Sequence, residues 1–125
     1  MSQRILVVED QEDNRRIIRD LLMSAGYELI EAADGEAGVR LAETERPDLI
    51  LMDIQLPVLD GHEATRRIKQ NPGLSAIPIV VVTSYALSGD DAKAMAAGAE
   101  GYVAKPFSPR ELLATIRKFL GDAKS

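Results

Sequence analysis

The chain has 125 residues, a length that suits a single domain over residues 1–125 and leaves no room for a second module. Hydrophobic residues make up 46% and charged residues 28%, as in an ordinary soluble globular protein, and the formal net charge of −5 argues against a nucleic-acid surface. The lack of cysteine fits the cytoplasm, and the first apolar run is too short for a signal peptide or a membrane span.

Strand-like and helix-like stretches alternate along the chain, beginning with a Val- and Ile-rich run over residues 5–8 that indicates a buried strand. A helix is expected over about residues 12–25, ended by Gly26 in a left-handed conformation. Residues 28–32 alternate polar and apolar side chains, as an edge strand would. The apolar face predicted for the helix consists of Ile17, Ile18, Leu21 and Leu22. Three arginines are expected on its outer side, namely Arg15, Arg16 and Arg19.

Two further helices begin at residues that can cap them. Asp34 is expected to cap a helix over residues 36–45, which stops before a proline. An apolar strand follows over residues 49–52. Asp60 and the glycine after it then open a third helix, which the turn residues 71–73 terminate.

The last part of the chain repeats the alternation. Residues 79–82 indicate another buried strand, and residues 102–104 a shorter one. The helix between them, over residues 90–97, is rich in alanine and has few large apolar anchors, so we expect comparatively weak packing. A capping box formed by Ser108 and Glu111 starts the final helix. The apolar stripe of that helix comprises Leu112, Leu113, Ile116, Phe119 and Leu120.

This alternation predicts an α/β fold, a doubly wound five-stranded parallel sheet between two layers of helices. In the usual strand order for this topology, 2-1-3-4-5, the third strand lies beside the first. Polar residues follow four of the strands: Glu9, Asp10, Asp53, Thr83 and Lys105. Since ligands bind beyond the carboxyl ends of such strands, these side chains should converge on one site that suits a divalent cation and a phosphoryl group.

The acidic loop after the first strand limits what the site could hold. A flavin carrier would place glycines and hydroxyls there to hold a phosphate, whereas this loop has Glu9 and Asp10, which favour Mg²⁺. With Mg²⁺ bound, Asp53 could be a third metal ligand or a nucleophile that forms an aspartyl-phosphate. Thr83 and Lys105 favour phosphoryl transfer, because they offer a hydroxyl and a positive charge to phosphoryl oxygens.

Four stretches of the chain resemble the receiver domain of bacterial two-component response regulators, the CheY-like family. They are ILVVED at 5–10, LMDIQLPVLDG at 51–61, VTS at 82–84 and AKPF at 104–107. The resemblance covers Ile5 to Leu120 and implies the flavodoxin-like three-layer sandwich of that family. The sequence from Met52 to Pro57 is most similar to receivers of hybrid kinases and of stand-alone cell-cycle regulators.

The resemblance implies a role for each matching acidic residue. Asp53 corresponds to the residue that accepts a phosphoryl group from a sensor histidine kinase or a phosphotransfer protein. Glu9 and Asp10 correspond to the acidic pair that holds Mg²⁺, together with Asp53 and the backbone carbonyl of Gln55.

Further roles are implied on the other side of the site. Thr83 corresponds to the hydroxyl that moves to the phosphoryl group, and Lys105 to the lysine that pairs with it. The bond from Lys105 to Pro106 corresponds to a cis position. Tyr102 corresponds to an aromatic switch residue, although it could equally be a half-buried aromatic residue of its strand.

These features predict a phospho-accepting switch that catalyses only its own phosphorylation and dephosphorylation. The chain stops at Ser125, soon after the last predicted helix. Unless it is an excised fragment of a longer protein, we expect no output domain and signalling by contact with a downstream protein. The expected output surface is formed by the fourth helix, the fifth strand and the fifth helix. We expect no contact with nucleic acid or membrane, and a monomer or a weak phosphorylation-dependent dimer.

Two other functions were weighed against this one. A phosphatase of the haloacid dehalogenase group would place two aspartates two residues apart after the first strand, whereas Asp10 precedes Gln11 and Glu12. A pseudo-receiver would bind partners without phosphorylation, and the complete set of site residues argues against it.

Three minor expectations concern residues near the site. Tyr85 could shield the phosphoryl group from water and prolong the phosphorylated state. His62 is expected to be a solvated helix residue. A basic face is expected at Arg66, Arg67 and Lys69.

Overall fold

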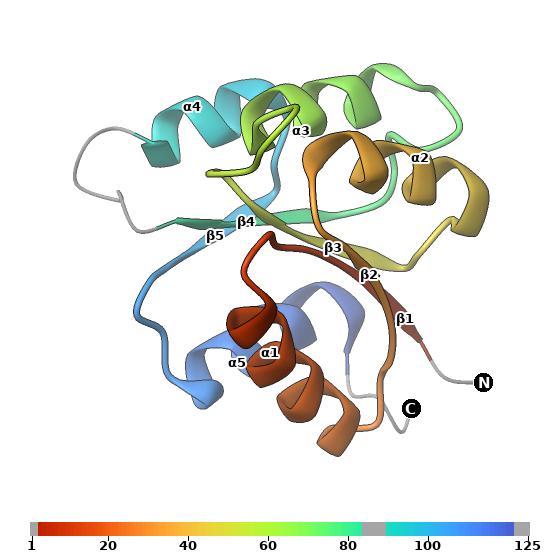
Figure 1. The fold of residues 1–125 in the computed structure, drawn as a ribbon. Coiled ribbons are helices and arrows are strands. Elements are labelled where there is room, and N and C mark those ends of the chain that lie inside the picture. Colours follow the sequence, from red (N-terminus) through yellow and green to blue (C-terminus); the bar gives the residue numbers. More distant parts are fainter. Residues whose placement is uncertain (1–2, 84–89, 122–125) are drawn as a thin grey trace.

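A computed structural model of the chain describes residues 3–83 and 90–121. Within these residues, five parallel strands form one sheet in the order β2-β1-β3-β4-β5, which confirms the predicted topology (Figure 1). The strands are β1 Arg4–Val8, β2 Glu28–Ala32, β3 Leu49–Asp53, β4 Ile79–Thr83 and β5 Gly101–Ala104.

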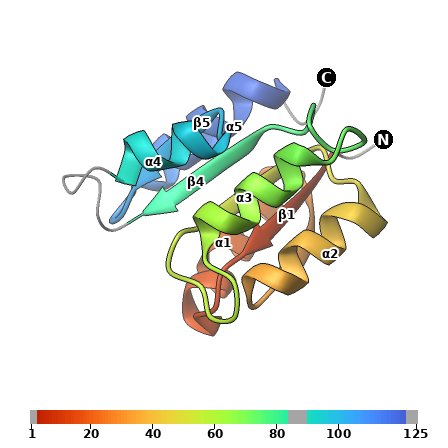
Figure 2. The same ribbon diagram turned by 90° about the horizontal axis from the view of Figure 1, so that it is seen from above.

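Helices cover both faces of the sheet, as predicted. Helices α1 and α5 lie on one face, and α2, α3 and α4 lie on the other, with α3 between its two neighbours (Figures 1 and 2). The helices are α1 Glu12–Ser24, α2 Gly35–Glu45, α3 Gly61–Gln70, α4 Asp90–Ala97 and α5 Pro109–Leu120. None of the helices in the described part of the chain is both long and apolar enough to cross a bilayer.

The central strands divide their side chains between two apolar cores. Leu6 and Val8 of β1 pack under α2, α3 and α4, while Ile5 and Val7 pack under α1 and α5. Successive side chains of a strand point to opposite faces, so a strand covered on both faces needs an unbroken apolar run. The edge strand β2 is only partly buried along most of its length.

The predicted helix starts are confirmed by side-chain caps. The carboxylates of Asp34 and Asp60 accept backbone N–H bonds from Ala37 at 2.7 Å and Glu63 at 2.9 Å. The Ser108 hydroxyl accepts the N–H of Glu111 at 3.1 Å. Each cap satisfies a donor that the first turn of a helix leaves without an intrahelical partner.

The exposure expected from the sequence was wrong for Ile17, Lys69 and His62. Ile17 is 60% exposed, because only Ile18 and Leu22 of α1 face the sheet directly. Lys69 is largely buried, since its ammonium pairs with Glu100 at 2.6 Å and also donates to two backbone carbonyls of the α3–β4 connection. Both ring nitrogens of His62 are buried from solvent, because α3 is covered by helices on two sides as well as by the sheet.

The start of α3 packs tightly against the end of β3. The N–H of Gly61 donates to the carbonyl of Ile54 at 2.9 Å. A Cβ atom at Gly61 would lie 2.1 Å from the carbonyl oxygen of Asp53, whereas one at Gly73 would meet nothing closer than 3.4 Å. Gly61 therefore permits the close approach that places α3 beside Asp53.

We expect Gly61→Ala to lower the free energy of unfolding by about 2–3 kcal/mol, because backbone atoms must move apart to admit the methyl group. The matched control, Gly73→Ala, should stay within about 0.5 kcal/mol of the wild type. Chemical denaturation of the three proteins makes the comparison. Equal stability of the two variants would contradict the close packing.

Candidate functional site

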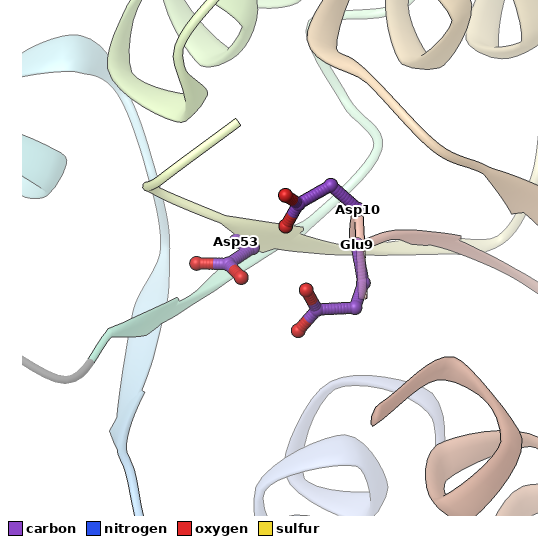
Figure 3. A group of neighbouring side chains, drawn as sticks. All are labelled: Glu9, Asp10 and Asp53. Atoms are coloured by element: carbon purple, nitrogen blue, oxygen red, sulfur yellow. The ribbon is translucent and has the colours of Figure 1, made fainter. Parts of the chain in front are cut away.

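Three carboxylates meet at the carboxyl ends of β1 and β3. These strands are neighbours, and Val8 pairs in register with Met52, so the residues that follow them lie side by side. Glu9, Asp10 and Asp53 each offer an oxygen within 4.8 Å of the others (Figure 3). Glu9 and Asp53 are buried, and Asp10 is partly buried.

Lys105 is the positively charged residue of this cluster. Its ammonium, on the loop after β5, donates to Glu9 Oε1 at 2.9 Å and to Asp53 Oδ2 at 3.0 Å. Burial lowers the pKa of Lys105, but the hydrogen bonds to Glu9 and Asp53 and the charges of these residues outweigh it. The pKa of Lys105 therefore lies above its ordinary value, and the residue stays charged at neutral pH.

Backbone N–H groups hold the second oxygen of each buried carboxylate. Gln11 donates to Glu9 Oε2 and Gln55 donates to Asp53 Oδ1, both at 3.1 Å. Each of the two carboxylates is thus fixed by Lys105 on one oxygen and by the peptide two residues later on the other. Asp10 makes no hydrogen bond of this kind within the described residues, so none of these residues occupies its carboxylate.

The donor set fits a hard divalent cation. All three groups offer oxygen, and three carboxylates against one ammonium leave an excess of negative charge that a cation would offset. Glu9, Asp10 and Asp53 could therefore hold Mg²⁺, as the sequence predicted. The part assigned to the carbonyl of Gln55 stays a prediction.

The remaining predicted site residues are distributed as follows. Thr83 ends β4 and pairs in register with Ala104, while its side chain lies outside the described residues. Tyr85 lies outside them as well. Tyr102 on β5 is 39% exposed. The peptide bond between Lys105 and Pro106 is cis.

Arg15 belongs to the surroundings of the site, although the sequence placed it on the outer side of its helix. Its side chain is only 15% exposed. The guanidinium donates to the backbone carbonyl of Glu9 at 2.8 Å and to the carboxylate of Glu12 at 2.6 Å. Its partners are Glu9 in the loop after β1, Glu12 on α1 and Glu31 on β2. Only the folded chain brings Glu31 to the other two.

A pocket of about 440 Å³ opens beside the carboxylates, between α1 and the loop after β5. Its walls are largely apolar, and exposed Ile17 is one of them. The pocket is lined by Glu9, Asn14, Ile17, Ile18, Lys105, Pro106 and Phe107.

Comparison with known proteins agrees with this geometry. Residues 5–117 match the family model of the response regulator receiver domain. The polar-differentiation response regulator DivK of Brucella anthropi is 42% identical over 123 residues, which cover 98% of this chain and 100% of the relative.

Two solved structures show the same fold. The receiver domain of the sensor histidine kinase PA1611 from Pseudomonas aeruginosa has a TM-score of 0.91 and 43% identity, covering 98% of this chain and 100% of its own. It was crystallised with a magnesium ion coordinated in its active site cleft. The chemotaxis protein CheY4 of Vibrio cholerae has a TM-score of 0.89 and 30% identity, covering 95% and 99% of the two chains.

We expect Asp10→Asn to raise the free energy of unfolding of the metal-free protein by about 1 kcal/mol, because it removes one of three crowded negative charges. The same change should reduce the stabilisation that added Mg²⁺ gives the wild type, which follows its affinity for the folded state. Thermal unfolding with EDTA and with MgCl₂ measures both effects.

Asp20→Asn is the matched control, since it removes an exposed negative charge outside the cluster. It should keep the full Mg²⁺-dependent stabilisation. Undiminished stabilisation of Asp10→Asn by Mg²⁺ would contradict the part of Asp10 in the site.

Proposed function

Because this chain belongs to the response regulator receiver domain family, we propose that it is a phospho-accepting switch of a two-component system or phosphorelay. The observation that supports this most directly is the Asp53 carboxylate. It is 7% exposed, lies at the end of a central strand and is held in the acidic cluster by Lys105 and Gln55. A nucleophile needs such a fixed position within reach of positive charge.

In the proposed reaction, one oxygen of Asp53 attacks the phosphorus of a phosphohistidine on a sensor histidine kinase or phosphotransfer protein. The new O–P bond forms as the P–N bond breaks, and the leaving imidazole keeps the bonding electron pair and takes up a proton. Lys105 gives up its hydrogen bond to Asp53 Oδ2 and donates to a phosphoryl oxygen instead. Glu9, Asp10, Asp53 and the Gln55 carbonyl would hold Mg²⁺. The ion would supply positive charge that offsets the carboxylates and the phosphoryl oxygens.

Phosphorylation adds a charge of about −1.5 to −2 at Asp53. In our proposal the response begins on β4, the strand beside β3. We assign the Thr83 hydroxyl the role of moving to the phosphoryl group, which shifts the connection to α4. This short helix buries the small residues Ala94 and Ala97, while its Met95 is 51% exposed. Its sparse anchoring supports a role as the element that changes position.

The output surface in this proposal consists of α4, β5 and α5, with Tyr102 as its switch residue. Exposure of Tyr102 and Met95 supports contact with a downstream protein there. We also propose that the 125 residues form a single domain and that the protein is cytoplasmic. It is a monomer or a weak phosphorylation-dependent dimer, and it turns over no external substrate.

We expect incubation with acetyl phosphate and Mg²⁺ to add the mass of one phosphoryl group to the wild type, and none to Asp53→Asn. The matched control is Asp60→Asn, because Asp60 lies outside the cluster and asparagine can still cap α3. It should be phosphorylated like the wild type. Intact-mass spectrometry measures all three proteins with and without EDTA.

A folded wild type that gains no mass, or that gains it without Mg²⁺ or in Asp53→Asn, would contradict this function. No gain in mass combined with normal Mg²⁺ binding would instead favour the pseudo-receiver.

For the output surface, we expect beryllofluoride with Mg²⁺ to change amide hydrogen exchange in α4, β5 and α5. Asp53→Asn, which cannot form the phosphoryl-like adduct, should show no change under the same conditions. Identical exchange of these elements with and without beryllofluoride in the wild type would refute the assigned surface.

A further inference from the structure

Arg15 makes contacts that its place on a surface helix does not require. Its guanidinium contacts Glu12 on α1 at 2.6 Å and Glu31 on β2 at 3.4 Å, and it donates to the backbone carbonyl of Glu9 at 2.8 Å. The side chain is 15% exposed. An exposed ion pair contributes little to stability, but a partly buried guanidinium shared among three acceptors restricts how they can move.

The carbonyl that Arg15 contacts belongs to the peptide between Glu9 and Asp10. The N–H of Glu9 donates to the carbonyl of Ala32 on β2 at 3.0 Å, so the backbone of Glu9 is held on both sides. The orientation of the Glu9–Asp10 peptide determines where the two side chains leave the backbone. Figure 3 shows both carboxylates directed towards Asp53.

Asp10 depends on this peptide more than Glu9 does. The carboxylate of Glu9 is also held by Lys105 and by the N–H of Gln11. Asp10 has no such bonds within the described residues, so among these residues only the backbone brings its carboxylate to the other two. Rotation of the Glu9–Asp10 peptide would therefore move Asp10 out of the group.

Glu31, the partner of Arg15 on β2, is itself held in place. Glu31 accepts two hydrogen bonds from Arg19, each of 2.8 Å. The hydrogen bond from Arg19 holds the pKa of Glu31 below its ordinary value, although burial opposes this, so Glu31 remains ionised. The edge strand thus gives Arg15 a permanent negative partner.

We propose that Arg15 is a positioning residue for the metal site, holding the Glu9–Asp10 peptide so that the Asp10 carboxylate joins those of Glu9 and Asp53. This inference takes one thing from the proposed function, namely that the bound cation is Mg²⁺. Outer partners of metal ligands typically contribute about 10- to 100-fold to metal affinity, and a partner that acts through the backbone should lie near the lower end.

The test is the affinity for Mg²⁺, measured by isothermal titration calorimetry at constant ionic strength and without a phosphodonor. We expect Arg15→Gln to weaken binding by about tenfold. Arg16→Gln is the matched control, since Arg16 is the next residue on α1 and pairs with Asp13 at i−3, as Arg15 pairs with Glu12. It makes the same charge change without the contact to Glu9, and it should bind Mg²⁺ within about twofold of the wild type.

Equal affinities of the Arg15→Gln and Arg16→Gln proteins would overturn the proposal, because the contact of Arg15 to the Glu9 carbonyl would then have no effect on Mg²⁺ binding. Thermal unfolding in EDTA checks that the variants are folded. Should Arg15→Gln unfold, Arg15→Lys and Arg16→Lys make the same comparison with charge retained, and again equal affinities overturn the proposal. Because no phosphodonor is present, a wild type that binds Mg²⁺ but is never phosphorylated would contradict the proposed function and leave the role of Arg15 standing.

Discussion

The crowding of like charges at the carboxyl ends of β1 and β3 is the constraint on which the site depends. Parallel neighbouring strands bring Glu9, Asp10 and Asp53 together, and Lys105 neutralises only part of their charge. Repulsion between these like charges lowers the stability of the folded chain. This excess of negative charge suits a divalent cation and, in the proposed function, a phosphoryl group that binds through the cation.

Hydrogen bonds from the backbone keep the crowded groups in place. Glu9 and Asp53 are held in the same way. One oxygen of each carboxylate accepts from Lys105, and the other accepts from the backbone N–H two residues later in the chain. Buried carboxylates held in this way cannot turn away from one another to relieve repulsion. Asp10 lacks these bonds among the described residues, so its place depends on the peptide that precedes it.

Much of this arrangement followed from local signals in the sequence. Strands were predicted because a strand covered on both faces is apolar throughout, and helix starts because Asp34, Asp60 and Ser108 are capping residues. The acidic group followed from the topology, since polar residues came directly after strands. The sequence places Arg15 and Lys69 on the surface because their partners on other elements, Glu31 and Glu100, are distant in sequence. Charge alone cannot tell a solvated lysine from one that Glu100 binds.

The connection after α4 is anchored to its neighbours, and this bears on how a change at Asp53 could spread. After α4, Glu100 accepts the N–H of Ile79 at 2.8 Å and the ammonium of Lys69 at 2.6 Å, which ties the start of β5 to β4 and α3. This anchor lies at the amino ends of the strands, opposite the carboxylates. The helix itself buries only alanines among its described side chains. In the proposed switch, a displacement that starts at the carboxyl end of β4 would be resisted by this anchor, and α4 would pivot about that end.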